Sequence, residues 1–421
     1  MKTLLALSFL LAASARAERP VIDLSGARVQ AYPLALPQGL GAPEVAGQVQ
    51  AVLAQDFERS GLFKLLDPNS FLAAPNEPFD KVDFAQWQAT GAAALVKLSC
   101  EAAAEPRCDL RLYDVQRGAS VLRVSAHGSL RQIAHRFADE VVKFFTQEPG
   151  VFQTRIAFVR ETETGEKQIV VADSDAANPQ VVVDGSINLL PAFSPDGRRL
   201  AFSSFRGGAG ARVYTADPVS RRIAPLLALG DFSTGAAYSP DGTRVVFSAS
   251  VDENTDVYLA QADGSNPRRL TDARGIDISA SWSPDGKRIA FVSERSGTPQ
   301  LYTMTAQGTD VRRLTFQGNY NQEPAWSPKG DLIAFSGRDE KRVFDIYLVS
   351  VETGKVARLT QNAGSNEKPA WAPNGRYLLF SSTRASGHRQ IFTMGADGSN
   401  QRALTSEKFG ASDPAWGPLG K

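Results

Sequence analysis

The tetrad Ser-Pro-Asp-Gly, at residues 194–197, 239–242 and 283–286, decides the fold of this chain. Three related tetrads follow at 327–330 (Ser-Pro-Lys-Gly), 372–375 (Ala-Pro-Asn-Gly) and 417–420 (Gly-Pro-Leu-Gly). The six prolines are separated by 45, 44, 44, 45 and 45 residues. Each tetrad suits a tight turn, because proline fixes φ, aspartate bonds locally and glycine accepts the exit conformation. A repeat of this length is typical of the four-stranded blades of a β-propeller.

The residues around each tetrad predict the strands of one blade. A strand that ends in an aromatic residue precedes the turn, as at 324–326, and a strand of the Ile-Ala-Phe type follows it, as at 332–336. A third strand carries Val-Tyr or a similar pair, as at 257–258, and a short fourth strand carries Arg-Leu-Thr, as at 269–271. We therefore expect antiparallel four-stranded meanders. A β-sandwich with accidentally similar turns would not explain six recurrences at nearly constant spacing.

The two ends of the repeat region complement each other. Strands of the Ile-Ala-Phe type begin at Ile156, Leu200, Val245, Ile289, Ile333 and Leu378. The first has no tetrad before it, and the last tetrad has no such strand after it. The C-terminal strand is therefore expected to complete the blade that begins near Ile156, which closes the ring and removes an exposed edge. This predicts an all-β propeller of six blades over residues 151–421.

Residues 31–150 read as an α/β domain. Apolar residues at helical spacing predict helices over 44–60 and 132–146, and a shorter helix is expected near 84–90. Alternating runs at 94–98 and 110–113 predict a β-hairpin, with further strands at 63–66 and 121–124. Cys100 and Cys108 lie between the two runs, where we favour a structural disulfide over two reduced thiols.

Residues 1–17 have the pattern of a cleaved signal peptide. A basic residue, an apolar run at 4–13 and the small-x-small sequence Ala15-Arg16-Ala17 follow one another. The alternative is a retained anchor, but the run is about half of the roughly 20 residues that a spanning helix needs. No later stretch is apolar enough to span a membrane, so export without a membrane span is expected. In residues 18–30, the β-prone patch of Val21, Ile22, Asp23 and Leu24 is either an edge strand or a peptide that a partner captures by strand addition.

Composition points away from catalysis and from nucleic acid. Lys plus Arg is 46 and Asp plus Glu is 45, which leaves no basic excess to grip a phosphate backbone. The histidines are only His127, His135 and His388, far apart in sequence, and no G-x-S-x-G elbow or phosphate loop occurs. We expect no catalytic residue, metal site or cofactor; the tetrad aspartates serve their turns. The alternative is a propeller-containing hydrolase or sugar-degrading enzyme.

The loops that lead into each innermost strand are the best candidates for binding, because a propeller presents them together at one mouth of its channel. They mix apolar and polar side chains, as protein interfaces do. The candidate residues are Phe232, Thr234, Gly235, Ile278, Tyr320, Asn321, Glu323, Asn366, Glu367 and Asp413.

The signal peptide, the small α/β domain, the junction Gly-Val-Phe-Gln-Thr-Arg-Ile-Ala-Phe at 150–158 and the six blades together resemble the TolB family. That family is the periplasmic component of the Tol–Pal cell-envelope system of Gram-negative bacteria. The resemblance covers essentially the whole chain. The tetrad alone is shared with other propellers, including those of prolyl oligopeptidases, so the junction and the domain order are its specific part.

The resemblance implies a non-enzymatic role in outer-membrane integrity and envelope constriction during cell division. The propeller mouth would bind the lipoprotein Pal, and the N-terminal segment at 18–30 would bind the inner-membrane protein TolA. Outer-membrane lipoproteins are further candidate partners. In some relatives the channel holds calcium, to which Glu323, Glu367 and Asp413 would contribute here.

Overall fold

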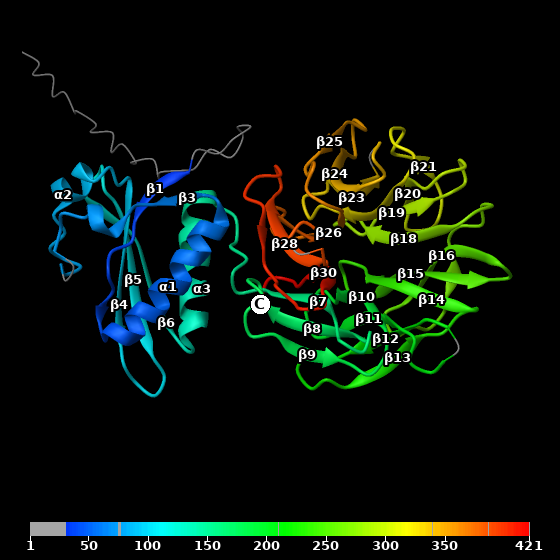
Figure 1. Cartoon of the computed structure of the whole chain (residues 1–421), viewed down its shortest axis with the longest axis horizontal. Coiled ribbons are helices and arrows are strands. Elements are labelled where there is room, and N and C mark those ends of the chain that lie inside the picture. Colours follow the sequence, from blue (N-terminus) through cyan, green and yellow to red (C-terminus); the bar gives the residue numbers. More distant parts are fainter. Residues whose placement is uncertain (1–30, 75–76, 209, 339, 386, 421) are drawn as a thin grey trace, which may run out of the picture.

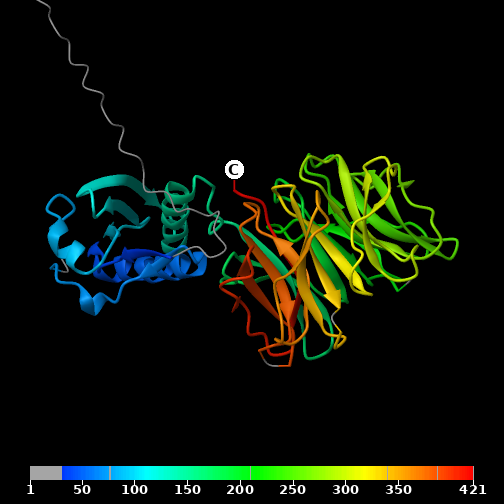
Figure 2. The same cartoon turned by 90° about the horizontal axis from the view of Figure 1, so that it is seen from above.

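The protein has an N-terminal α/β domain followed by a six-bladed β-propeller, as the sequence predicts (Figure 1). The computed structural model describes residues 31–420 except 75, 76, 209, 339 and 386. The expected signal peptide at 1–17 and the segment at 18–30, with Val21, Ile22, Asp23 and Leu24, lie outside the described residues. Figure 2 shows from above that the two domains lie side by side.

The N-terminal domain is built on a sheet with strand order β3-β1-β4-β5-β6, in which β2 also pairs with β4. Its strands are β1 (Tyr32–Ala35), β2 (Leu40–Gly41), β3 (Phe63–Leu65), β4 (Ala94–Glu101), β5 (Arg107–Asp114) and β6 (Ala119–His127). Its helices are α1 (Pro43–Ser60), α2 (Phe84–Ala89) and α3 (Leu130–Thr146), with a short 3-10 helix at Pro68–Ser70.

The pleat of β4 explains why both faces of this sheet are covered. Side chains alternate between the faces of a strand. Val96 accordingly belongs to the core with α1 and α3, whereas its neighbour Leu95 belongs to a second core with Trp87 of α2. Figure 1 shows α1 and α3 side by side along the sheet.

The ends of the two long helices follow local sequence signals. Pro43 stands in the first turn of α1, and Gly61, at a φ of 69°, ends it in the left-handed conformation that favours glycine. A capping box between Ser129 and Gln132 begins α3. These signals fix both ends of α1 and the start of α3.

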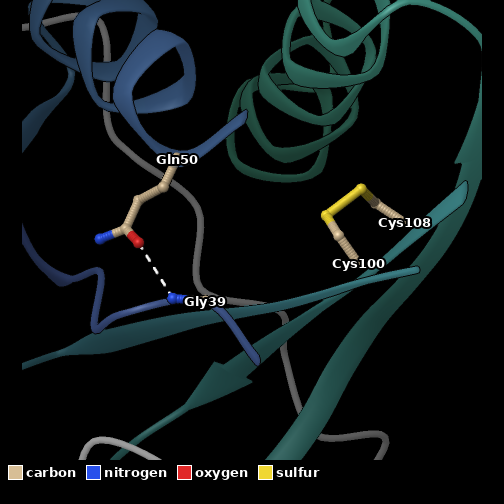
Figure 3. The surroundings of a disulfide bond; sticks show 4 residues. All are labelled: Gly39, Gln50, Cys100 and Cys108. Carbon is tan, nitrogen blue, oxygen red and sulfur yellow. Dashed lines mark hydrogen bonds between the residues drawn. A yellow bond between two sulfur atoms is a disulfide. The ribbon is translucent and has the colours of Figure 1, made fainter. Parts of the chain in front are cut away.

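Cys100 and Cys108 form a disulfide between facing positions of β4 and β5. Figure 3 shows this bond near α1, whose Gln50 side chain accepts a hydrogen bond from the Gly39 backbone at 3.0 Å. Both cysteines are fully buried in the core beneath α1 and α3. The disulfide therefore ties the two central strands together inside the core.

Each blade of the propeller is an antiparallel sheet of four strands, counted from the channel outward. Blades 1 and 2 consist of β10 (Asn188–Phe193), β11 (Leu200–Ser204), β12 (Arg212–Ala216) and β13 (Ile223–Leu227), then β14 (Phe232–Tyr238), β15 (Arg244–Val251), β16 (Asn254–Gln261) and β17 (Arg268–Arg269). Blades 3 and 4 consist of β18 (Asp277–Trp282), β19 (Arg288–Ser293), β20 (Gln300–Thr305) and β21 (Arg312–Arg313), then β22 (Asn321–Trp326), β23 (Leu332–Arg338), β24 (Phe344–Ser350) and β25 (Val356–Arg358). Blade 5 consists of β26 (Asn366–Trp371), β27 (Tyr377–Ser382), β28 (Gln390–Gly395) and β29 (Arg402–Ala403).

Blade 6 closes the ring from both ends of the repeat region. Its innermost strand is the C-terminal β30 (Ala411–Trp416), which pairs with β7 (Arg155–Glu161). β8 (Lys167–Asp173) and β9 (Gln180–Val183) complete it. This is the predicted closure, in which the last strand covers the open edge that β7 would otherwise have.

The second strand of every blade carries a buried phenylalanine, which forms the repeated core of the propeller. The six are Phe158, Phe202, Phe247, Phe291, Phe335 and Phe380. In blades 1 to 5 each ring lies 5.5–5.9 Å from an aromatic ring of the third strand. This repeated pair explains why the Ile-Ala-Phe and Val-Tyr patterns recur together in the sequence.

Candidate protein-interaction site

The two ends of the blades differ in what they carry. In a four-stranded meander, the turns between strands one and two and between strands three and four lie at one end of the blade. The loops between strands two and three, and those that lead to the next blade, lie at the other end. We call this second end the mouth face and the end with the tetrad turns the turn face. The predicted binding loops belong to the mouth face.

Four large apolar side chains are exposed on loops of the mouth face. Phe316 is 73% exposed, and Ile187, Phe205 and Ile276 are each more than 40% exposed. They come from the loops β21–β22, β9–β10, β11–β12 and β17–β18. Apolar anchors among polar loops are typical of protein interfaces. Ile187, Ile276 and Phe316 stand in loops that lead into an innermost strand, the kind that the sequence singled out, although none of the three was among the selected residues. Phe205 stands in a loop between the second and third strands, a kind of connection that the sequence did not single out.

Several predicted site residues are accessible at or near this face. Phe232 and Thr234 lie at the start of β14 and are half-buried. Tyr320, also half-buried, packs its ring 5.7 Å from Phe344, with the Arg338 guanidinium 4.7 Å from its centroid. Ile278 is half-buried because part of its side chain packs into the core between blades 3 and 4.

Asn321 and Asn366 are in the predicted loops, but their side chains are buried, at 3% and 0% exposure. The Asn321 amide donates to the Gln300 side chain at 2.9 Å and to the Gln317 carbonyl at 2.9 Å. The Asn366 amide donates to Asp345 at 2.9 Å. Neither side chain is presented to a partner, because its hydrogen bonds are used inside the propeller. We therefore assign both a supporting role beneath the mouth.

Each innermost strand has a β-bulge where it enters the channel, and the bulge residue has a positive φ. The six bulge residues are Leu190, Gly235, Ser279, Glu323, Lys368 and Asp413, with φ between 49° and 65°. All six line a channel cavity of about 410 Å³. Each stands five residues before a tetrad proline, so the period of the sequence contains the signal for this ring.

The charged side chains of the bulge ring all lie in one half of it. Leu190, Gly235 and Ser279 form its uncharged half, whereas the other half is charged throughout. There Lys368 makes a direct ion pair with Asp413, and its Nζ lies 3.6 Å from Glu323 Oε1. Glu367 points elsewhere: its Oε1 accepts from Ser365 Oγ at 2.8 Å and pairs with Arg389. The predicted Glu323, Glu367 and Asp413 are thus divided between two basic partners.

The charges of this wall affect one another. Burial raises the pKa of Glu323, and the neighbouring Lys368 opposes this effect. Burial would lower the pKa of Lys368, but the carboxylates of Asp413 and Glu323 outweigh it and raise that pKa above its usual value. Lys368 therefore keeps its positive charge in the channel at neutral pH.

The N-terminal domain contacts the turn face. Arg131 of α3 donates to Asp173 Oδ2 at 3.1 Å and to Asp175 Oδ2 at 2.6 Å, at the turn after β8. Glu148 pairs with Lys329 and Arg376, at 2.9 Å each, in or beside the tetrad turns of blades 4 and 5. Because these contacts are at the turn face, they leave the mouth face open.

One group of side chains in the described part of the chain has the composition of a metal site. Ligand atoms of His135, Asp173 and Asp175 lie within 4.8 Å of one another. The Arg131 guanidinium already bonds both carboxylates and donates to His135 Nε2 at 3.2 Å. Since a guanidinium only donates, His135 Nε2 accepts and its Nδ1 carries the hydrogen that faces Asp56 Oδ2 at 2.6 Å. The group thus holds an arginine side chain between the domains.

Within the described residues, the other two histidines have no comparable partners. His127 is 71% exposed and 4.0 Å from an equally exposed Glu105. His388 is exposed on the mouth face beside Arg389, whose guanidinium pairs with Glu367. Among residues 31–420, the described helices include none with the length and apolarity to cross a membrane.

These features define a two-domain protein, in which an α/β domain holds the turn face of a six-bladed propeller and leaves its mouth free. Comparison with known proteins is more specific. The TolB amino-terminal domain family matches residues 20–121, and the TolB beta propeller domain family matches residues 142–420. The chain therefore belongs to the TolB family.

Individual relatives agree with this assignment. The Tol-Pal system protein TolB of Anaeromyxobacter dehalogenans strain 2CP-1 is 47% identical over 353 residues, which cover 81% of this chain and 80% of that protein. The protein of the same name from Myxococcus xanthus is 45% identical over 213 residues, 48% of this chain and 49% of that protein. The crystal structure of TolB from Acinetobacter baumannii superposes with a TM-score of 0.83 at 26% identity, and the match covers 95% of this chain and all of that one.

Proposed function

We propose that this protein is a periplasmic, non-enzymatic interaction component of a Tol–Pal system. In this proposal the mouth face binds Pal and the segment at 18–30 binds TolA. Through these partners the protein supports outer-membrane integrity and envelope constriction during cell division. Family membership supports the system, and the open mouth face with its four exposed apolar side chains supports binding there.

The Pal contacts in this proposal are the accessible members of the predicted set together with the exposed apolar residues. They are Ile187, Phe205, Phe232, Thr234, Gly235, Ile276, Ile278, Phe316, Tyr320 and Glu367, with Glu323 and Asp413 deeper in the channel. The rim supplies apolar anchors, and the channel supplies charge for orientation. Outer-membrane lipoproteins other than Pal would use the same face.

A pair of matched variants tests the Pal site. Phe316, 73% exposed, stands on the mouth face, whereas Val219, 79% exposed, stands in the β12–β13 turn of the turn face. We expect F316S to weaken Pal binding by about tenfold, a typical cost for a buried aromatic anchor, and V219S to leave the affinity unchanged. Titration calorimetry with purified Pal measures both. Equal affinities of F316S and the wild type for Pal would exclude Phe316 from the site. A loss of affinity in V219S alone would place Pal on the turn face instead of the mouth face.

A deletion separates the two partner sites. Removal of residues 18–29 should abolish capture of purified TolA and leave Pal binding intact, because the mouth is built wholly by the propeller. The mature chain with residues 18–29 replaced by a Gly/Ser sequence of equal length is the matched control for length. TolA binding that survives either change would contradict the assignment of this segment.

The non-enzymatic part of the proposal rests on the chemistry of the mouth. Several described nucleophiles and acids there are engaged in structural bonds: Ser336 Oγ donates to Glu323 at 2.8 Å, and Glu367 pairs with Arg389. A nucleophile-directed covalent probe should not label the purified protein. Stoichiometric labelling would favour the alternative, a propeller-containing hydrolase or sugar-degrading enzyme.

A further inference from the structure

The charged half of the channel ring contains an ammonium group where an ion could otherwise lie. Glu323 comes from β22 of blade 4, Lys368 from β26 of blade 5 and Asp413 from β30 of blade 6. The Lys368 side chain is 30% exposed, Glu323 19% and Asp413 only 5%. Two carboxylates from blades 4 and 6 thus converge on one cation that the intervening blade supplies.

The backbone of Lys368 has a left-handed conformation and bonds blade 4. Its φ of 57° is a left-handed conformation that a residue other than glycine adopts at a cost of roughly 1–2 kcal/mol. Its backbone N–H donates to Glu323 Oε2 at 3.0 Å and to Ser336 Oγ at 2.9 Å. The amide of Lys368 is therefore bonded to blade 4, whereas its ammonium lies between Asp413 of blade 6 and Glu323 of blade 4. The left-handed conformation is shared by all six bulge residues, so what distinguishes Lys368 is the ammonium group that this repeated bulge places beside two carboxylates.

The residues present do not fit calcium, the ion that the family resemblance suggests for the channel. Calcium takes six to eight oxygen ligands at 2.3–2.6 Å. Here Asp413 is paired with the Lys368 ammonium, Glu323 lies 3.6 Å from it, and Glu367 is paired with Arg389. An ion of charge +2 between Glu323 and Asp413 would meet an ammonium that is already there.

We propose that Lys368 is the resident cation of this channel, which replaces a metal ion and joins blades 4, 5 and 6 at the closure of the ring. Asp413 lies on the strand that closes the propeller, so the ammonium ties this strand to its two neighbours. The mouth is then assembled without calcium, and the protein is insensitive to the calcium concentration of its surroundings. A neutral residue at 368 would leave two converging carboxylates and create a site for a divalent cation.

Thermal unfolding with and without calcium tests this proposal. We expect millimolar calcium chloride to leave the unfolding midpoint of the wild type unchanged from its value in chelator. K368M should have a lower midpoint in chelator, which calcium partly restores, because a ligand that binds only the folded state stabilises it. K355M removes the charge of an exposed lysine on the β24–β25 connection and should behave as the wild type does. Calorimetric titration of calcium into K368M should show one site, with none in the wild type.

Two outcomes would overturn the proposal. One is a calcium-induced rise of the unfolding midpoint in the wild type as large as the rise in K368M, because the ion would then bind beside the ammonium. The other concerns the triple variant K368M/E323Q/D413N, which removes all three charges. We expect it to fold without any response to calcium, even if K368M alone does not fold. A triple variant that does not fold would show that the lysine is needed for packing and not for charge. The test involves neither Pal nor TolA, so its result is independent of the proposed function.

Discussion

The tetrad aspartates show how a residue that resembles a metal ligand can serve the backbone instead. In the first three turns the serine hydroxyl donates to the aspartate at 2.5–2.6 Å, and the backbone N–H two residues later donates to the same oxygen at 3.0–3.1 Å. In the fifth turn Asn374 takes this place and accepts from the Arg376 N–H at 3.1 Å. Four of the six turns thus use an acceptor side chain at this position, whereas Lys329 and Leu419 occupy it in the other two. The negative charge of the aspartates is an addition whose effect depends on pH.

The charge of Asp241 should make a pH-dependent contribution to stability. Hydrogen bonds from Ser239 and Thr243 lower its pKa from 3.8 to about 2. Because the folded value is the lower one, the contribution is complete above the unfolded value and is lost as pH falls through the folded value. We expect the wild type to unfold at a higher temperature than D241N near neutral pH, and the difference to shrink as pH falls from the unfolded value through the folded value of about 2. A difference that stays constant over a thermal series from neutral to acid pH would contradict this account.

A second residue-scale device is the buried threonine that joins the third and fourth strands. Thr315 donates to the Gln300 side chain at 2.8 Å and accepts from the Leu301 N–H at 3.0 Å. The same arrangement pairs Thr271 with Asp256, Thr360 with Asp345 and Thr405 with Gln390. The threonine of the Arg-Leu-Thr and related motifs therefore joins the fourth strand of a blade to the third by buried hydrogen bonds.

Loss of the Thr315 hydroxyl should lower the free energy of unfolding. T315V has nearly the same shape but leaves the Leu301 N–H without its hydroxyl acceptor, so we expect a loss of about 1–3 kcal/mol in the free energy of unfolding. T315S keeps the hydroxyl and should recover most of it. Urea denaturation of the two variants measures the difference. Equal losses in both would assign the effect to the methyl group and not to the hydrogen bonds.

Among the elements, the hairpin of β4 and β5 is the part whose stability depends on a covalent bond. The Cys100–Cys108 disulfide closes a loop with a sequence separation of 8. Closure of such a short loop is worth about 2–3 kcal/mol through the entropy of the unfolded chain. C100A/C108A should therefore unfold its N-terminal domain at lower denaturant concentration, with the propeller transition unchanged. Circular dichroism in the near and far ultraviolet can separate the two transitions. An unchanged transition of the N-terminal domain would contradict the prediction.

The elements were predictable where the signal is local or repeated. The period of 44 or 45 residues predicts every blade, and the missing strand at each end predicts the closure by β30. Contacts between distant residues were not predictable. His135 and Asp56 are 79 residues apart, and no local pattern in the sequence links the two. Asn321 and Asn366 were also predicted as binding residues, although their side chains are buried. Their burial was not predictable, because it depends on the strands around the loop and not on the composition of the loop itself.

At the scale of the whole molecule, hydrogen bonds and ion pairs join the two domains. Arg59 Nη2 pairs with Asp56 at 3.1 Å within α1 and donates to Ser174 Oγ of the propeller at 2.9 Å. The Tyr377 hydroxyl, on the propeller, donates to the Ser60 carbonyl at the end of α1 at 3.1 Å. Interfaces of this polar kind between domains commonly permit relative motion. The orientation of the α/β domain should therefore respond to charge and ionic strength, whereas the mouth face should not.

Arg131 is the centre of these contacts, so its loss and the loss of its partners' charge should have the same effect. Burial would raise the pKa of Asp175, but Arg59 and Arg131 outweigh it and hold that pKa below its usual 3.8; Lys329 and Arg376 likewise outweigh the burial of Glu148 and hold its pKa below 4.5. Because the docked values are the lower ones, docking is favoured above these usual values and weakens as pH falls below about 4.

We expect R131M to weaken docking by about 1–3 kcal/mol at neutral pH, the cost of leaving partly buried carboxylates without their partner. In small-angle scattering, R131M should show a larger radius of gyration than the wild type, and acidification should produce the same increase in the wild type. R136M, an exposed position on the same helix, is the matched control and should scatter as the wild type does. Equal radii of gyration for R131M and R136M would show that the Arg131 contacts do not set the arrangement of the domains.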